Sequence, residues 1–331
     1  MIPAKFTIAV GGSRKAKQWK NKEFSWSDIL DKLRVTTRTR ESAADYANLS
    51  KPRQDEIKDV GGFVGGYIKN GRRIAGNVVK RQLVTLDADF ADSSFMTILD
   101  LVLGDVCYAV YSTHKHTPEK PRLRVVIPLA RAVQPDAYQA IARRIADDIG
   151  MDLFDDTTYE AERLMYWPST STDGEYIFFA NDRENCLDPD DVLAAYDDWR
   201  DTSTWPESSR ANKMRQAAVK KQGDPYEKPG AIGAFCRTYS VPDVIDCFLN
   251  DVYEPCGEGR YTYKQGSTSG GLVVYEDGKF AYSHHGTDPV SGKLVNSFDL
   301  VRLHLFGDKD VDVEVCLLYT SPSPRDAHES R

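Results

Sequence analysis

Two aspartates, Asp87 and Asp89, end a hydrophobic stretch over residues 78–90 that predicts a β-strand. Because alternate residues of a strand point to the same face, the two carboxylates project together. Adjacent carboxylates repel each other unless a cation lies between them, and hard oxygen ligands on a rigid strand suit Mg²⁺ or Mn²⁺. Two such ions serve nucleotidyl transfer, where one activates the attacking hydroxyl and the other neutralises the leaving pyrophosphate. The Asp-x-Asp pattern also occurs by chance, so the alternative is a polar strand end without catalytic function.

A cluster of histidines and cations follows, around the end of the next predicted strand and the start of the one after it. It comprises His114, Lys115, His116, Arg122 and Arg124. The histidines could bind a transition metal as a His-x-His pair, donate hydrogen bonds to phosphate, or lie in a solvated turn. The cations favour phosphate, because arginine forks match phosphate oxygens and positive charge opposes zinc binding. If the strands are neighbours, this cluster faces Asp87 and Asp89 across a site the size of a nucleoside triphosphate.

A third charged segment lies further along the chain. It contains Asp152, Asp155, Asp156 and Arg163. One of its aspartates could complete a three-carboxylate metal site with Asp87 and Asp89, and the alternative is an exposed acidic loop.

Several other chemistries are excluded by motifs that the sequence lacks. No GxxxxGK[ST] occurs, so the chain holds no P-loop ATPase, and no GxSxG elbow positions a serine nucleophile. The six cysteines form no CxxC pair, which argues against structural zinc and for reduced thiols. His284, His285 and Asp288 lack a further ligand at metal-binding spacing, so we expect a structural or substrate-loop role. Without a long apolar run or a secretory signal, the chain is expected in the bacterial cytoplasm, with no membrane segment.

Charge is distributed unevenly along the chain, which has a net charge of −7. Residues 1–81 hold 18 Lys and Arg against 8 Asp and Glu, and the remainder is acidic. A basic first quarter predicts either a binding surface for a polyanion or an ordinary solvated surface. Arg14 and Lys15, in a glycine-containing loop after a strand predicted over 5–10, are the candidates for contact with nucleic acid.

Periodicity predicts a β-α-β-β-α-β order in the part that carries these motifs. The expected strands are 78–90, 106–113, 122–129 and material within 163–168 and 175–180, with helices at 95–103 and 135–149. This order is the split βαβ, or ferredoxin-like, arrangement. Two helices would cover one face of such a sheet and leave the other face available for a ligand. The fold class is therefore α+β.

The sequence divides into four parts. We expect a catalytic domain over 1–180 with an N-terminal α/β extension, a helical and polar linker over 181–229, and a small α+β domain over 230–312. The small domain is predicted to contain a helix over 241–252, a hairpin over 271–284 and a helix over 297–305. Residues 313–331 resemble a translated sequencing adapter and are excluded, which implies that the natural protein continues.

The order of the three motifs resembles that of the archaeo-eukaryotic primase superfamily. They read LDAD at 86–89, STH at 112–114 and FD at 154–155. The flanking text, including RQLVTLDADF and YSTHKHTPEKPRLRVVIPL, is similar to the primase-polymerase part of virulence-associated protein E family proteins of phages and integrated elements, over roughly residues 1–310. The resemblance implies an RNA-recognition-like core and a P-loop helicase further along the intact polypeptide.

The resemblance also implies roles for individual residues. Asp87, Asp89 and Asp155 would bind the two divalent metals, with Asp156 as the alternative third ligand. His114, or else His116, would contact the phosphates of the incoming nucleotide. Lys115, Arg122, Arg124 and Arg163 are electrostatic candidates for triphosphate or template contacts.

The expected function is that of a DNA primase-polymerase, a nucleotidyltransferase acting on a single-stranded DNA template with NTPs or dNTPs. One alternative is a rolling-circle replication endonuclease, although HKH at 114–116 has a charged middle residue. Another is a non-catalytic single-stranded DNA-binding module in which the carboxylates are structural.

Overall fold

The structure is a computed structural model that describes residues 2–307, so the tail at 313–331 lies outside the described residues. The chain divides between Ser209 and Arg210 into two compact units. The first unit extends past residue 180, because residues 189–205 pack on the helix over 135–149: Leu193 and Trp205 join its core, and the Tyr196 hydroxyl donates to the Ala140 carbonyl. No helix among residues 2–307 is long and apolar enough to cross a membrane.

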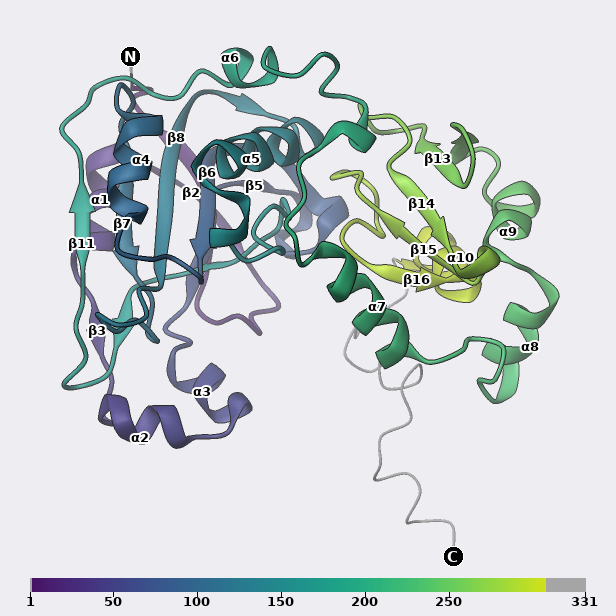
Figure 1. The fold of residues 1–331 in the computed structure, drawn as a ribbon, viewed down its shortest axis with the longest axis horizontal. Coiled ribbons are helices and arrows are strands. Elements are labelled where there is room, and N and C mark those ends of the chain that lie inside the picture. Colours follow the sequence, from purple (N-terminus) through teal and green to yellow (C-terminus); the bar gives the residue numbers. More distant parts are fainter. Residues whose placement is uncertain (1, 308–331) are drawn as a thin grey trace, which may run out of the picture. The chain divides into compact units, whose positions relative to one another are not determined.

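A five-stranded antiparallel sheet is the centre of the first unit, and it has the order β11-β7-β8-β6-β5 (Figure 1). The strands are β5 (Gly66–Ile68), β6 (Val78–Ala88), β7 (Ala109–Ser112), β8 (Leu123–Val133) and β11 (Phe178–Ala180). Because β6 and β7 are each antiparallel to β8, they run parallel to each other on either side of it.

The fourth strand of the predicted arrangement lies elsewhere. The strand expected within 175–180 pairs with β7 as β11, whereas β5 occupies the free edge of β6. The Gly65 carbonyl accepts hydrogen bonds from the amides of Gln82 (2.8 Å) and Leu83 (3.0 Å), and these bonds hold the segment before β6 at this edge. Helices accompany the sheet, as the predicted α+β class requires. Its strand order, however, differs from that of a four-stranded ferredoxin-like fold.

Two helices cover one face of the central sheet, α4 (Phe95–Leu103) and α5 (Pro135–Ile149) (Figure 1). Val84, Leu86 and Ala88 alternate toward them, as period-two patterning predicts. The sequence predicts the bounds of both helices correctly, because each has a strong apolar period and a terminating glycine.

The other face is covered rather than open, which corrects the expectation of a free ligand face. A second sheet of order β2-β1-β4-β9 and helix α1 (Trp26–Arg34) lie over it. The strands are β1 (Phe6–Gly11), β2 (Lys20–Phe24), β4 (Gly62–Val64) and β9 (Met165–Tyr166). Phe6, Ile8 and Ile29 are fully buried there, so the N-terminal segment buries its apolar side against the central sheet.

Short elements complete the first unit, and two of its helices were not expected from the sequence. The unexpected helices are α2 (Ala43–Asn48) and α3 (Lys51–Ile57). The remaining elements are β3 (Thr37–Arg38), β10 (Ser169–Thr170), α6 (Pro189–Leu193), η1 (Lys69–Gly71), η2 (Ala75–Asn77), η3 (Met151–Leu153) and η4 (Thr202–Thr204). Strand β3 pairs in parallel with β10 and so connects the chain before α2 to the segment after β9.

The second unit is an antiparallel meander with helices. Its strands are β12 (Tyr253–Pro255), β13 (Arg260–Tyr263), β14 (Leu272–Tyr275), β15 (Phe280–Ser283) and β16 (Leu294–Asn296), in that order across the sheet. Its helical elements are α7 (Ala211–Gln222), α8 (Gly230–Thr238), α9 (Val241–Phe248), η5 (Glu276–Gly278) and α10 (Ser297–Leu305). The predicted hairpin around η5 and the helix over 297–305 are both present.

A buried polar network holds this unit together, centred on Asp288. Its carboxylate accepts hydrogen bonds from the Tyr253 hydroxyl (2.7 Å), the Ser283 hydroxyl (2.7 Å) and the Val290 amide (2.9 Å), and lies 3.3 Å from His304 Nε2. The nearby His285 ring is also occupied, by Thr268 and by backbone groups. These contacts give the SHHGTD segment a structural role.

Asp288 predicts an acid limit to the stability of the second unit. Burial by itself raises the pKa of this carboxyl, but the hydrogen bonds and the proximity of His304 outweigh burial and hold the pKa below its ordinary value. A depressed folded-state pKa gives stability that is present above the unfolded value and lost as pH falls through the folded one. Asp288→Asn should cost about 3 kcal/mol at neutral pH and remove that acid dependence. Hydrogen exchange over residues 241–305 measures both; an unchanged acid limb in the variant would contradict this assignment.

Candidate active site

The first and third acidic motifs meet at the end of β6. The Asp155 amide donates to the Asp87 carbonyl (2.8 Å), and the Asp87 amide donates to the Thr158 hydroxyl (2.8 Å). Two backbone-directed hydrogen bonds therefore fix the loop after η3 against the strand end. Asp155, rather than Asp156, lies next to Asp87, because Asp156 accepts from the Ser208 hydroxyl instead.

Each of the three carboxylates has an arginine beside it. Arg124 lies directly opposite Asp87 in the β6–β8 register, with its Nε 3.5 Å from the carboxylate. Arg122 is 2.9 Å from Asp89. Arg163 is 3.4 Å from Asp155. The acidic and basic side chains that the sequence singled out are thus brought together as three ion pairs around one end of the sheet.

The carboxylates still affect one another despite these pairs. Burial, and then the charge of Asp87, raise the pKa of Asp89; Asp155 adds to the rise and Arg122 opposes it. Burial and like charge both disfavour the ionised form of this carboxyl, and a cation bound beside it would favour that form.

The oxygen donors at this end of the sheet suit a hard divalent cation. The buried Oδ1 of Asp87 has no hydrogen bond, and neither does the facing Nε of Arg124. Carboxylate oxygens are the ligands that Mg²⁺ and Mn²⁺ prefer. Within residues 2–307, no group of three His, Cys, Asp or Glu side chains is placed so that it could hold a metal ion. Instead, three arginines pair with the three acids and neutralise them.

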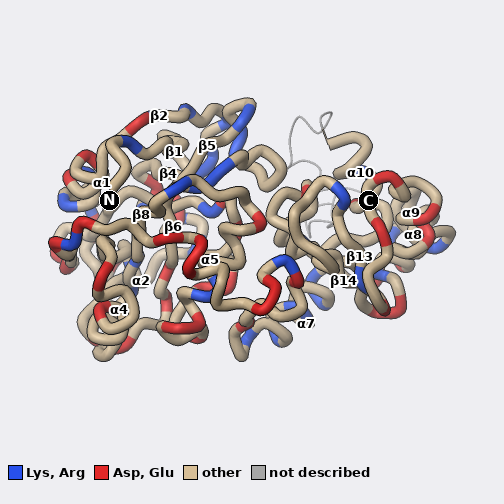
Figure 2. The backbone as a smooth tube through the Cα atoms, turned by 90° about the horizontal axis from the view of Figure 1, so that it is seen from above, with Lys and Arg blue, Asp and Glu red and all other residues tan. Residues whose placement is uncertain are grey.

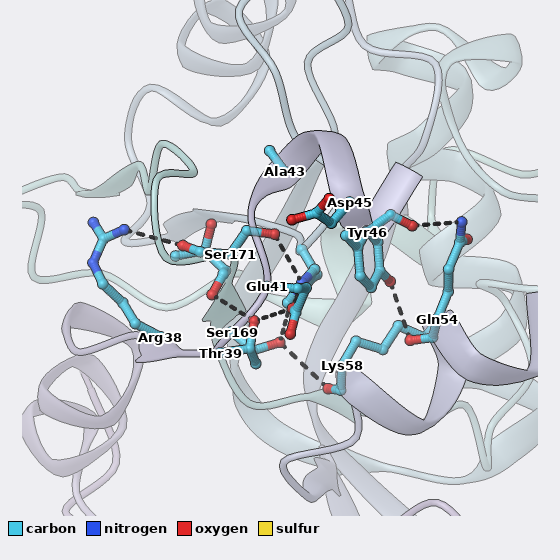
Figure 3. A network of polar contacts seen from close by, with 12 residues as sticks. Arg38, Thr39, Glu41, Ala43, Asp45, Tyr46, Gln54, Lys58, Ser169 and Ser171 are labelled. Carbon is cyan, nitrogen blue, oxygen red and sulfur yellow. Dashed lines mark hydrogen bonds and ion pairs between the residues drawn. The ribbon is translucent and has the colours of Figure 1, made fainter. Parts of the chain in front are cut away.

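His114, which follows β7, lies in a network of polar contacts. Its Nδ1 is 3.1 Å from the Ser169 hydroxyl, and its Nε2 is 3.4 Å from both Glu41 and the Ser171 hydroxyl. The ring packs against Tyr46, with 4.2 Å between centroids. Figure 3 shows Glu41, Ser169 and Ser171 converging beside Tyr46 of α2. Burial lowers the pKa of His114, and the Glu41 carboxylate opposes that shift.

A basic pocket of about 250 Å³ adjoins this histidine. Its wall is formed by Ala43, Tyr46, Ala47, Gln54, His114, Lys115, His116, Thr117, Lys120 and Arg122. The pKa of Lys115 is lowered, first by burial and then by the charges of Lys51, Lys58 and Arg122. Several cations therefore act on the Lys115 ammonium group. Because Arg122 both lines this pocket and pairs with Asp89, the pocket adjoins the carboxylates.

The remaining residues predicted from the sequence as nucleotide or template contacts differ in their surroundings. His116 Nδ1 accepts from the Arg122 amide (3.2 Å), so this histidine fastens the strand start. Arg14 is held by Asp55 (3.7 Å), and its amide donates to the Asp59 carboxylate (2.9 Å). Lys15 is exposed, and among the described residues no side-chain contact ties it to the site.

Sequence reasoning missed the residues that surround His114. They are Glu41, Tyr46, Lys58, Ser169 and Ser171. They lie in or next to short elements without periodicity, namely α2, α3 and β10. The alternation of Ser169 and Ser171 after a predicted strand was the one available signal, since it places both hydroxyls on one side.

Comparisons with known proteins bear on the first unit. A solved structure, the primase-polymerase AEP domain (PP-N190) of cyanophage S-2L, matches with 13% identity, 58% of this chain covered, 88% of that chain covered and a TM-score of 0.33. Likeness at that level supports no inference about shared geometry. No curated protein matches the chain. Residues 3–208, more than half of the chain, match the family model of the VapE N-terminal domain. The chain therefore belongs to the VapE N-terminal domain family, which confirms the family expected from its motifs.

Proposed function

We propose that the first unit is the catalytic part of a DNA primase-polymerase of a phage or mobile element, which joins nucleotides on a single-stranded DNA template. The observation that carries the proposal is the position of Arg122, shared between the Asp89 carboxylate and the basic pocket at His114. A nucleoside triphosphate in that pocket would have its phosphates close to Arg122 and to the Asp89 carboxylate that Arg122 contacts. Membership of the VapE family supports a role in replication priming.

Asp87, Asp89 and Asp155 would hold two Mg²⁺ or Mn²⁺ ions, which when bound supply the charge for activating the attacking hydroxyl and neutralising pyrophosphate. The protein itself contributes by fixing the positions of these carboxylates. The hydrogen bonds that join Asp155 and Thr158 to Asp87 fix the donors on a rigid strand end. Arg122 and Arg124 exchange their carboxylate partners for phosphate oxygens, which match the guanidinium fork.

His114 would bind the triphosphate from the opposite wall. Ser169 and Tyr46 fix the plane of the ring, and Lys115 adds positive charge beside it. Such pre-oriented cations stabilise the charge that develops on the phosphates during transfer. A P-loop helicase in the intact protein belongs to the proposal on family grounds alone.

The non-catalytic alternative has one observation in its favour, namely that all three carboxylates are neutralised by arginines. The rolling-circle endonuclease has none. Its histidine pair must share one metal, whereas here His114 contacts Glu41 and Ser169, and His116 contacts Arg122 and Glu175.

Removal of a single carboxylate charge tests the proposed reaction. Asp87→Asn and, separately, the more exposed Asp89→Asn should each lower primer synthesis and extension by at least about 100-fold, because metal charge is lost where transition-state charge develops. The assay uses single-stranded DNA with labelled NTPs or dNTPs and Mg²⁺ or Mn²⁺. Asp105→Asn, at an exposed aspartate, is the matched control. Wild-type activity in both site variants would refute the catalytic assignment, and an inactive wild type that still binds DNA would favour the binding module.

The histidine predicts a pH-dependent nucleotide KM. Glu41 raises the pKa of His114 against the effect of burial, so Glu41→Gln should lower it further. Protonated His114 is then lost at lower pH, and the pH above which KM rises should move downward, with kcat at low pH little changed. Steady-state kinetics across the titration range of histidine measure the shift.

Glu119→Gln is the control, because Glu119 lies exposed in the loop after β7. A KM profile that is identical in the Glu41 variant and wild type would contradict a phosphate-binding role for protonated His114.

A further inference from the structure

Two segments that are far apart in sequence lie side by side at the edge of the first unit. The Trp19 amide donates to the Gly71 carbonyl (2.8 Å). The Asn21 side chain donates to the Ile68 carbonyl (2.8 Å) and accepts from the Ile68 amide (3.0 Å). The start of β2 is therefore fastened along the end of β5 and η1.

This pairing collects exposed cations, here named the basic strip. Its members are Lys20, Lys22, Lys69 and Arg72, with Lys80 of β6 half-buried at its side. Figure 2 shows blue stretches of the chain gathering beside β2 and β5. Neighbouring cations repel one another, so the stability of the fold does not explain why they are gathered here.

The charges of the basic strip are not used within the described part of the chain. None of its five members is in an ion pair there, whereas Lys5 pairs with Glu23 and Arg14 with Asp55. An exposed aromatic ring lies among them: Tyr67, which is 38% exposed and stands directly opposite Lys80. Cations interleaved with an aromatic ring are typical of surfaces that bind single-stranded nucleic acid.

The basic strip leads to the carboxylates. Arg73, the residue after Arg72, packs over the Trp19 ring (5.4 Å) and donates to the Glu162 carbonyl (3.2 Å). The next residue, Arg163, is the partner of Asp155. A polyanion lying along the basic strip would therefore arrive at the proposed catalytic site.

We propose that the basic strip binds the sugar-phosphate backbone of single-stranded DNA and leads the strand toward Asp155. That the bound strand is the template rests on the proposed function; that the surface binds DNA does not. The assignment moves the nucleic-acid contact from Arg14 and Lys15, the candidates from sequence, to residues on β2 and η1. Arg14 is already neutralised by Asp55.

The test compares two triple variants of the full chain. Lys20→Gln/Lys22→Gln/Lys69→Gln removes three charges from the basic strip, and Lys213→Gln/Lys220→Gln/Lys221→Gln removes three from exposed positions on α7. Binding of a labelled oligothymidylate is measured by fluorescence anisotropy over a salt series, without metal or nucleotide. The strip variant should bind about tenfold more weakly and reduce the slope of log K against log salt by about 2, while the control matches wild type. Tyr67→Leu should weaken binding about fivefold or more through loss of stacking.

Equal binding by the strip variant and wild type, or equal loss in both triple variants, overturns the proposal. Loss of binding to phosphatidylserine vesicles without loss of oligothymidylate binding assigns the surface to a membrane and also overturns it. Primer extension separates the two proposals. If wild type makes no product while the strip variant has lost DNA affinity, the basic strip binds DNA but the primase function fails. If wild type extends primers and the strip variant binds DNA normally, the primase function is supported but the role of the basic strip fails.

Discussion

The antiparallel pairing of β6 with β8 is the contact on which the site depends. Its register sets Asp87 opposite Arg124 and brings Arg122 to Asp89. A slip of one residue would turn these side chains toward the apolar face under α4 and α5, so burial of Val84 and Leu86 fixes the chemistry as well as the core. The covering N-terminal sheet then leaves the strand ends as the place where charge can gather.

Charge balance connects the parts of the site. Three acids and three arginines neutralise one another, and the basic pocket at His114 lies beyond Arg122. Partly buried ion pairs of this kind are costly to separate unless each partner gains a replacement. On the proposed function, a divalent cation would replace arginine as the partner of the carboxylates, and a triphosphate would replace carboxylate as the partner of the arginines. We therefore expect metal and nucleotide to bind to this site together, as the proposed function requires.

The sequence predicts those features that rest on strong local patterns. Helices α4, α5 and α10 and the strand that ends at Asp87 follow from apolar periods and terminal glycines. Which strand fills the edge of β6 depends on the Gly65 carbonyl, a non-local choice that periodicity does not contain. The sequence assigns Asp155 as the third ligand with Asp156 as the alternative, and it is the Asp155 amide that donates a hydrogen bond to the Asp87 carbonyl. The sequence does not predict roles for Glu41 and Tyr46, because α2 and α3 are too short to show an apolar period.

We propose that carboxylates and arginines exchange partners when metal and nucleotide bind. Electron paramagnetic resonance of Mn²⁺, titrated into the protein with and without a non-hydrolysable nucleoside triphosphate, measures this most directly. We predict weak Mn²⁺ binding alone, binding at least about tenfold tighter with the triphosphate, and loss of that enhancement in Asp89→Asn. If the enhancement is absent in wild type, or is as large in Asp89→Asn as in wild type, the proposed exchange of partners is wrong.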